Sequence, residues 1–180
     1  MWVEYTKDLL KMTEDLLTKE YLSRFPTLLR EVLTEEQKQR DRFLRRVKEN
    51  YQPVRVFRGI HNEEEIIDDD FICNIEESEK YGGSSYKRVQ VEHYAISVNE
   101  DPKAIVKSLS IPNINHPWLM LGEGMMEQEH GPADFMGDAT HHNWFLYEAS
   151  IPLMKNKFVI TDECRRIVKE AREEQAKPET

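Results

Sequence analysis

The sequence predicts an α+β protein, with helices in the first third of the chain and short strands through most of the rest. Up to about residue 50, apolar residues recur every three or four positions, the spacing of one helix face. After Pro53 the pattern changes to short extended runs. A block of helices followed by strands is typical of the α+β class. The 180 residues are the size of one ordinary domain, so we expect a single compact unit.

Residues 1–50 are predicted to form a helical leader that packs on the core. Its first helix, within residues 2–22, carries an apolar stripe made of Trp2, Tyr5, Leu9, Met12 and Leu16. A break follows at Pro26. Thr34 is the predicted cap of another helix, which runs to about Asn50, with Gln37 completing a capping box. We expect its basic residues to be solvated and paired with acids nearby on the same helix; they are Lys38, Arg40, Arg42, Arg45, Arg46 and Lys48.

Residues 51–180 are predicted to hold a small mixed or antiparallel sheet. The expected strands are VRVFRGI (54–60), RVQVEHYAISV (88–98), HNWFLYEASIP (142–152) and KFVI (157–160). Residues 62–70 are predicted to be an acidic turn, residues 71–75 a weak strand or a turn, and residues 82–85 a loop. One helix is expected after Asn99 as its cap, with Pro102 in the first turn, and a closing helix is expected after Thr161.

The stretch from Ile111 to His142 is predicted to be a long irregular insertion. It is rich in Pro, Gly, Asn, His and Met, and its apolar residues follow no dominant period. Loops of this length in a compact domain are usually functional or mobile.

Charge and composition exclude several classes of partner. The formal net charge is -9 and the isoelectric point is near 5.2, so a general affinity for nucleic acid or anionic membranes is not indicated. No apolar run approaches the roughly 20 residues of a membrane span. Cys73 and Cys164 lie far apart and form no CxxC motif, which favours a reducing, cytoplasmic setting.

Arg58 and Gly59, near the end of the predicted strand 54–60, are the first candidates for a binding site. A strand that only fills a core has no need of a guanidinium at its end. One interpretation is an exposed arginine paired with Glu63, Glu64 or Glu65. The other is an anion site, since Arg58 supplies a planar fork of donors and Gly59 has no side chain to block a diphosphate.

A second stretch, HYAISVNEDPKAIVKSL (93–109), passes from a strand ending in small polar residues directly into a helix. Together with Arg58-Gly59 it resembles the ADP-ribosyltransferase superfamily, in its arginine–serine–glutamate branch. Ser97-Val98-Asn99 stands where that family has Ser-Thr-Ser, and Ala104 lies in the helix that follows. The stretch NWFLYEASIP is similar to the hydrophobic strand placed after the second motif, so the resemblance spans residues 54 to about 152.

The resemblance implies that NAD is the substrate and gives each motif residue a role. It implies that Arg58, Gly59, Ser97 and Asn99 bind NAD, with Arg58 gripping the diphosphate or the adjoining ribose. The family's third element is a glutamate motif, because a carboxylate stabilises the positive charge that develops on the ribose. Here the only Glu-x-Glu after Ser97 is Glu127-Gln128-Glu129. Glu129 and Glu127, with Arg58, are therefore the candidate catalytic residues.

Two further acids are possible sources of the catalytic carboxylate. Glu148 lies in the predicted strand 142–152, and Glu163 is expected in the first turn of the closing helix, where it favours the helix dipole.

The leading hypothesis is thus an ADP-ribosyltransferase that modifies a macromolecular target, most simply a protein, like those of bacterial toxins and phage effectors. The alternative is a catalytically inactive scaffold that binds another protein as an inhibitor or adaptor, through the leader and the insertion. A third hypothesis is a metal-dependent hydrolase built on side chains of the insertion: His116, His130, His141, His142, Glu123, Glu127, Glu129, Asp134 and Asp138. Their spacing matches no fixed metal motif, so we expect loop histidines and no metal.

Overall fold

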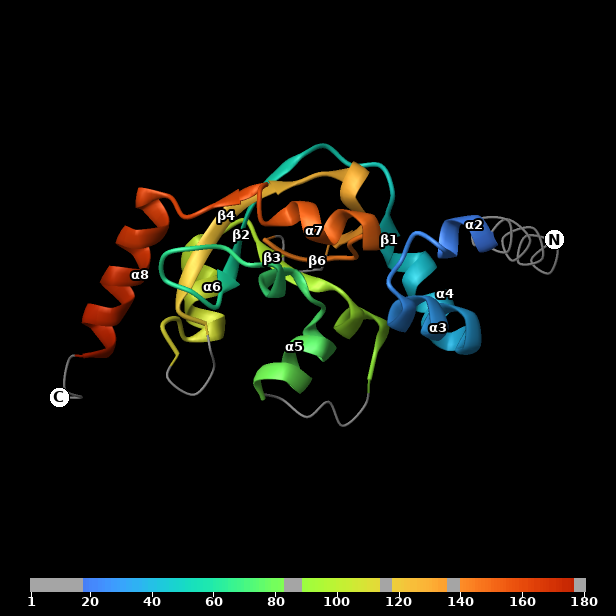
Figure 1. Cartoon of the computed structure of the whole chain (residues 1–180), viewed down its shortest axis with the longest axis horizontal. Coiled ribbons are helices and arrows are strands. Elements are labelled where there is room, and N and C mark those ends of the chain that lie inside the picture. The colour runs from blue at the N-terminus through green and yellow to red at the C-terminus, as the bar shows by residue number, and fades with distance from the viewer. Residues whose placement is uncertain (1–17, 83–88, 114–117, 136–139, 177–180) are drawn as a thin grey trace, which may run out of the picture.

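The computed structural model describes residues 18–82, 89–113, 118–135 and 140–176, and these form a mixed α and β protein (Figure 1). The described residues contain seven α-helices: α2 (Lys19–Leu22), α3 (Thr27–Glu35), α4 (Gln37–Arg46), α5 (Asn74–Tyr81), α6 (Pro102–Leu109), α7 (Ile151–Met154) and α8 (Asp162–Gln175). They also contain seven strands: β1 (Val47–Lys48), β2 (Val54–Ile60), β3 (Ile96–Asn99), β4 (Met120–Met126), β5 (Ala133–Phe135), β6 (His141–Trp144) and β7 (Phe158–Val159). Short 3-10 helices are η1 (Asp68–Phe71), η2 (Val91–Tyr94), η3 (Gln128–His130) and η4 (Glu148–Ser150).

The strands form one sheet in the order β1-β5-β6-β3-β2-β4-β7, and every neighbouring pair is antiparallel. The longest pairing joins β2 to β4, from Val54 opposite Met126 to Ile60 opposite Met120. The sequence predicted a mixed or an antiparallel sheet, and the antiparallel arrangement is the one found.

Strand β2 contributes to two cores, because successive side chains of a strand point to opposite faces. Phe57 belongs to a cluster that α6 and α8 complete with Ile105, Val106, Ile167 and Val168. Val56 belongs to a second cluster, with Phe71, Ile96, Val98, Trp144 and Met154. Figure 1 shows α8 at one end of the molecule and α2 to α4 at the other.

The helices α2 to α4 are joined to the sheet by a third apolar cluster and by ion pairs. The cluster contains Phe25, Leu29, Leu33, Phe43, Val91, Ala95, Phe145 and Tyr147. Arg46 bridges Glu92, at 2.6 Å, and Asp134, at 2.9 Å, and Arg42 also pairs with Glu92. The prediction that the basic residues pair with acids on their own helix is wrong for Arg42 and Arg46, since their partners come from η2 and β5. The apolar stripe predicted from Trp2 to Leu16 lies outside the described residues.

The prediction of one irregular insertion from Ile111 to His142 is wrong. The stretch contains β4, which pairs with β2 along its full length, and also β5 and the start of β6. The strand is hidden in the sequence because glycine has low strand propensity. Gly124 is needed because an added Cβ would lie 2.6 Å from the ring of Phe158. Met120 and Met126, in the same strand, are buried.

Two other predicted strands are shorter than expected. Within residues 88–98, residues 91–94 form η2 and only the end belongs to β3. Within residues 142–152, strand β6 ends at Trp144, and η4 and α7 follow. Pro152 lies in the first turn of α7, a position that proline tolerates because its missing N–H has no helical partner there.

Helix starts were predicted with mixed success. Thr34 is not a cap: its hydroxyl donates to the carbonyl of Arg30 inside α3. Asn99 is the last residue of β3, and Asp101 is the cap of α6. Residues 74–81 form α5, so the prediction of a strand or a turn at 71–75 missed a helix. Thr161 does cap the closing helix, by accepting a hydrogen bond from the Cys164 N–H. In the described ranges, no helix has both the length and the apolar character needed to cross a membrane.

Candidate functional site

A pocket of about 300 Å³ opens beside the centre of the sheet, within the size range of small-molecule sites. Strands β2 and β3, helices α5 and α6, and the segments on either side of residues 114–117 line it. The lining residues are Arg58, Asn74, Glu77, Ser78, Ser97, Ser108, Leu109, Ser110, Asn113 and Trp118. Hydroxyl and amide groups therefore surround one guanidinium, one carboxylate and one indole. Such a set suits a polar ligand with an aromatic part.

Arg58 is buried in the sheet, with 2 % of its surface exposed. The guanidinium donates to the carbonyls of Asp70 and Ser97 and, from Nη2, to Oε1 of Glu77 at 3.1 Å. The interpretation of an exposed strand-end arginine paired with residues 63–65 is wrong, because β4 pairs with β2 past this position. Arg58 therefore brings a positive charge to the pocket wall, and Glu77 is its anionic partner.

Glu77 is the carboxylate of the pocket, and the sequence did not point to it. It lies on the buried side of α5. Burial raises the pKa of its carboxyl, while the nearby charges of Arg58 and His61 oppose that rise. The family pattern places its glutamate after the serine strand, whereas Glu77 precedes that strand and lies in a helix that was not predicted. One signal for the start of this helix is Glu76, three residues after the cap Cys73: its side chain accepts a hydrogen bond from the Cys73 N–H, as the glutamate of a capping box does.

A buried histidine and aspartate lie behind Glu77. His61 Nδ1 is 2.7 Å from Oδ1 of Asp70, which also accepts the backbone N–H of His61. The imidazole stacks between Tyr81 and Trp118, with ring centroids 4.3 and 4.5 Å away. His61 Nε2 is 3.7 Å from Oε1 of Glu77. Asp70, His61, Glu77 and Arg58 thus form a series of polar and charged contacts, of which only Glu77 and Arg58 line the pocket.

Of the residues that the sequence predicted to bind NAD, some line the pocket and others do not. Ser97 lines the pocket, and its Oγ accepts from Nδ2 of Asn74 at 3.3 Å. Asn99 is not among the lining residues; its Oδ1 accepts from the Asp101 N–H. Gly59 packs behind the pocket wall, because an added Cβ would lie 2.8 Å from Leu109 and 2.9 Å from Trp118. Its missing side chain serves this packing.

Glu127 and Glu129 are not brought together with Arg58. Met126, just before Glu127, pairs with Val54, four residues along β2 from Arg58. At about 3.3 Å per residue the two positions are separated by ~13 Å along the strand. Neither glutamate lines the pocket. Glu148 lies in η4, and Glu163 lies in the first turn of α8, where it pairs with Arg55.

The side chains proposed for a metal-dependent hydrolase are also divided. His142 contacts Glu100 at 2.7 Å, and Asp134 is paired with Arg46. Only Glu127, Glu129 and His130 come together among the described residues. His116 and Asp138 lie outside the described residues.

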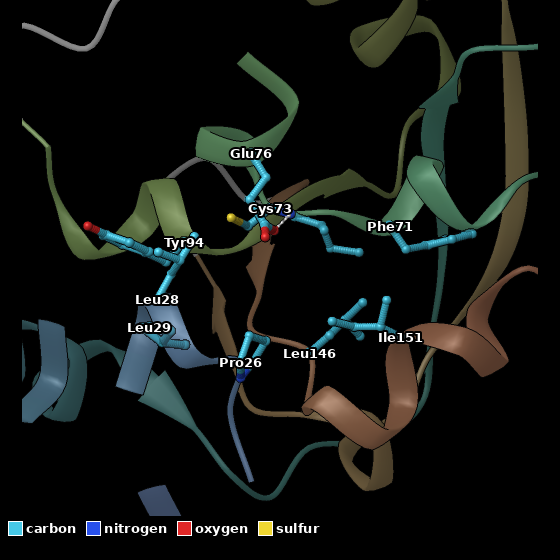
Figure 2. Close-up of a pocket in the computed structure, with 10 residues that line it drawn as sticks. Pro26, Leu28, Leu29, Phe71, Cys73, Glu76, Tyr94, Leu146 and Ile151 are labelled. Carbon is cyan, nitrogen blue, oxygen red and sulfur yellow. Dashed lines mark hydrogen bonds between the residues drawn. The ribbon is translucent and has the colours of Figure 1, made fainter. Parts of the chain in front are cut away.

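A second recess lies between α3 and the sheet (Figure 2). Apolar side chains dominate it: Pro26, Leu28, Leu29, Phe71, Tyr94, Ile96, Leu146 and Ile151. Figure 2 shows Cys73 and Glu76 at its upper edge, joined by the hydrogen bond that starts α5. Its volume of about 20 Å³ holds roughly one water molecule, so it is a packing defect and not a ligand site.

Comparison with known proteins gave no match of this chain to a protein-family model, to a curated protein or to a solved structure.

Proposed function

We propose that the pocket binds the nicotinamide ribose end of NAD and that the protein transfers ADP-ribose to a macromolecular target, most simply a protein. One observation carries the proposal: Arg58, Ser97 and a carboxylate, Glu77, line a single pocket. The sequence resemblance supplies the substrate, and the charges and hydroxyls of the pocket are compatible with it. The fold is a mixed α and β one with an antiparallel sheet, and we propose that it is of the ADP-ribosyltransferase type.

The reaction needs an ionised carboxylate beside the ribose. The bond between C1′ of the ribose and the nicotinamide nitrogen breaks, and its electron pair leaves with neutral nicotinamide. Positive charge develops on the ribose, and the Glu77 carboxylate stabilises it. A nucleophile of the target, or water, then attacks C1′, and Glu77 accepts its proton. Glu77 takes this role in the proposal in place of Glu129 and Glu127, which lie outside the pocket.

Arg58 acts mainly through position and charge. Its four hydrogen bonds go to protein groups, so it fixes Glu77 and the β3 backbone while its positive charge favours a phosphate nearby. Hydroxyls of Ser78, Ser97 and Ser108 offer partners for ribose and phosphate oxygens. Trp118 gives an aromatic wall for a planar ring.

The test is release of nicotinamide from NAD by the purified protein, measured by chromatography, together with the melting temperature in the presence of NAD. We expect Glu77→Gln to lower the rate by about 100-fold or more, the usual loss for an electrostatic group of a transition state. Glu79→Gln is the matched control, since Glu79 lies two residues along the same helix and is exposed. It should keep full activity.

The alternative of an inactive scaffold makes the opposite prediction. If NAD neither raises the melting temperature nor loses nicotinamide, the transferase proposal is wrong and the adaptor hypothesis takes its place. One observation bears on that alternative: in the stretch expected to form its binding surface, Met120 and Met126 are buried in the core, whereas Met125 is exposed.

A further inference from the structure

The turn after β4 gathers two carboxylates and an imidazole away from the pocket. One ligand atom from each of Glu127, Glu129 and His130 lies within 4.8 Å of the others. His130 Nε2 is 3.2 Å from Oε1 of Glu129 and 3.5 Å from Oε2 of Glu127. Imidazole nitrogen and carboxylate oxygen together are ligands that zinc and related divalent cations accept.

The buried ring nitrogen of His130 lacks a hydrogen-bond partner in the part of the chain that the structure describes. Its side chain is only 8 % exposed, and Nε2 is buried with no hydrogen-bond partner among the described residues. The nearby carboxylate oxygens do not meet hydrogen-bond geometry with this nitrogen. Buried polar atoms in folded proteins almost always have a partner, because an unsatisfied one costs free energy. Nε2 thus lies at ion-pair distance from two carboxylate oxygens without a hydrogen bond to either, and a cation bound between the three atoms would give each of them a partner.

The spacing of the ligand atoms fits tetrahedral zinc. With zinc bonds of about 2.0–2.1 Å to nitrogen and oxygen, two ligands at a tetrahedral angle are separated by roughly 3.3 Å. The two distances from His130 Nε2 to the carboxylate oxygens, 3.2 and 3.5 Å, lie on either side of this value. Three protein ligands leave a fourth position for water.

The backbone that carries these ligands is held firmly. The Gly131 carbonyl accepts from the Tyr51 hydroxyl at 2.7 Å and from Trp144 Nε1 at 3.1 Å. The His130 carbonyl accepts from the Tyr147 N–H at 2.9 Å. A Cβ at position 131 would lie 2.0 Å from the Phe145 carbonyl oxygen, so only glycine allows the turn to pack this closely against that backbone. Such support preorganises a metal site.

We propose that Glu127, Glu129 and His130 form a structural site for a divalent transition cation of the zinc type. Lys157 now occupies the outer side of the two carboxylates, with Nζ 3.5 Å from Glu127 and 3.9 Å from Glu129. It is a half-exposed, flexible cation at loose ion-pair distance, so a doubly charged ion displaces it. The site lies beyond the end of β4, apart from the NAD pocket, and its role is to hold the η3 turn against the sheet.

The test is zinc titration of the untagged full chain by calorimetry, with the melting temperature measured at each zinc concentration. We expect one zinc per chain and a rise in melting temperature. The double variant Glu127→Gln/Glu129→Gln should weaken binding at least tenfold and abolish the rise. Glu129 is exposed and Glu127 is partly exposed, and glutamine has nearly the shape of glutamate, so this variant should fold. The matched control Glu79→Gln/Glu148→Gln changes two exposed carboxylates elsewhere and should bind as the wild type does.

Two further measurements separate a metal site from a simple ion-pair cluster. Lys157→Met should tighten zinc binding about threefold or more, because a competing cation is gone. Cobalt should give the intense visible absorption of a tetrahedral complex, and His130→Gln should remove it. Absence of zinc binding, or equal binding by the double variant, would overturn the proposal. Nicotinamide release from NAD is measured without metal, so its failure and the failure of this site are distinguishable.

Discussion

Arg58 and Glu77 form a buried ion pair, with 3.1 Å between Nη2 and Oε1. Arg58 belongs to the central strand β2 and Glu77 to α5, so the pair ties this helix to the sheet. Removing both charges from water is costly unless hydrogen bonds satisfy the remaining donors. The carbonyls of Asp70 and Ser97 do so for the guanidinium. The pair is therefore a fixed part of the pocket wall.

Replacing Arg58 should cost far more stability than replacing an arginine three residues away on the same strand. Arg58→Met leaves Glu77 buried without its cation and two carbonyls without donors, so we expect a loss of about 3–5 kcal/mol. Arg55 pairs with Glu123 and Glu163, both at 2.7 Å, but its side chain is half exposed. Arg55→Met should therefore cost at most about 1 kcal/mol.

Urea unfolding of the wild type and both variants measures this difference. Equal losses for Arg58→Met and Arg55→Met would show that the guanidinium of Arg58 is hydrated in solution and that the buried pair does not exist.

The stability contribution of Glu77 should fall as pH rises. Burial raises the pKa of this carboxyl above its ordinary value of 4.5. The folded protein then holds the proton more tightly than the unfolded chain does. Stability is therefore lost as pH rises from about 4.5 through the raised pKa. Glu77→Gln removes the titration, so the wild type should lose stability relative to this variant over that window.

Glu123 provides a control of opposite sign. A hydrogen bond from Arg55 lowers the pKa of its carboxyl, so its contribution is present above pH 4.5 and is lost as pH falls through the lowered pKa. From about one pH unit above the ordinary value of 4.5 up to pH 7, the difference between wild type and Glu123→Gln should stay constant. Urea unfolding at several pH values tests both statements. A constant difference for Glu77→Gln as well would show that its pKa is not raised.

The sequence was most informative where a signal is local. Alternating apolar residues marked β2, and Thr161 marked the start of α8, because each depends on side chains close in the chain. It failed for β4, whose Gly122 and Gly124 weaken any strand pattern. That strand exists because β2 pairs with it along its full length, a long-range contact that residue patterns near 120 do not reveal.

The sequence predicted some residues of the candidate site and missed others. Arg58 stood out as a guanidinium at the end of an apolar strand, and Ser97 through the resemblance of its strand to a family motif; the structure places both at one pocket. Glu77 did not stand out, because α5 carries few apolar residues and begins at Cys73, an unusual cap. His61 and Asp70 were also missed. These two residues meet because the turn at residues 62–69 brings them together. The sequence of the predicted acidic turn did not show which of its aspartates would contact His61.

Arg46 should stabilise the packing of the N-terminal helices against the sheet. It bridges Glu92 and Asp134, two carboxylates that are nearly buried. Burial raises the pKa of Asp134, and the charge of Arg46 opposes the rise. Arg46→Met should cost about 3 kcal/mol, because two buried carboxylates lose a cation. Arg45→Met, one residue earlier and exposed, should change stability by about 0.5 kcal/mol or less.

Thermal and urea unfolding of the two variants decide this prediction. Limited proteolysis should also cut the Arg46→Met variant earlier within residues 18–46, since the loss is localised to that junction. If Arg45→Met is as damaging as Arg46→Met, the bridge is not what holds these helices.

Gly59 should matter for the shape of the pocket even though it does not line it. An added methyl group would lie 2.8 Å from Leu109 and 2.9 Å from Trp118, two residues that do line the pocket. Gly59→Ala should therefore cost about 1–3 kcal/mol and displace the indole. In the proposed function, it should also reduce the rise in melting temperature caused by NAD. Gly122→Ala on the paired strand is the comparator, because its nearest atoms are side-chain carbons of Ile60 and Ile66 at 3.3 Å, which can yield. It should cost less and leave the response to NAD unchanged. If the two alanine variants behave alike in unfolding and in NAD response, close packing at Gly59 does not shape the pocket, and the indole is positioned by other contacts.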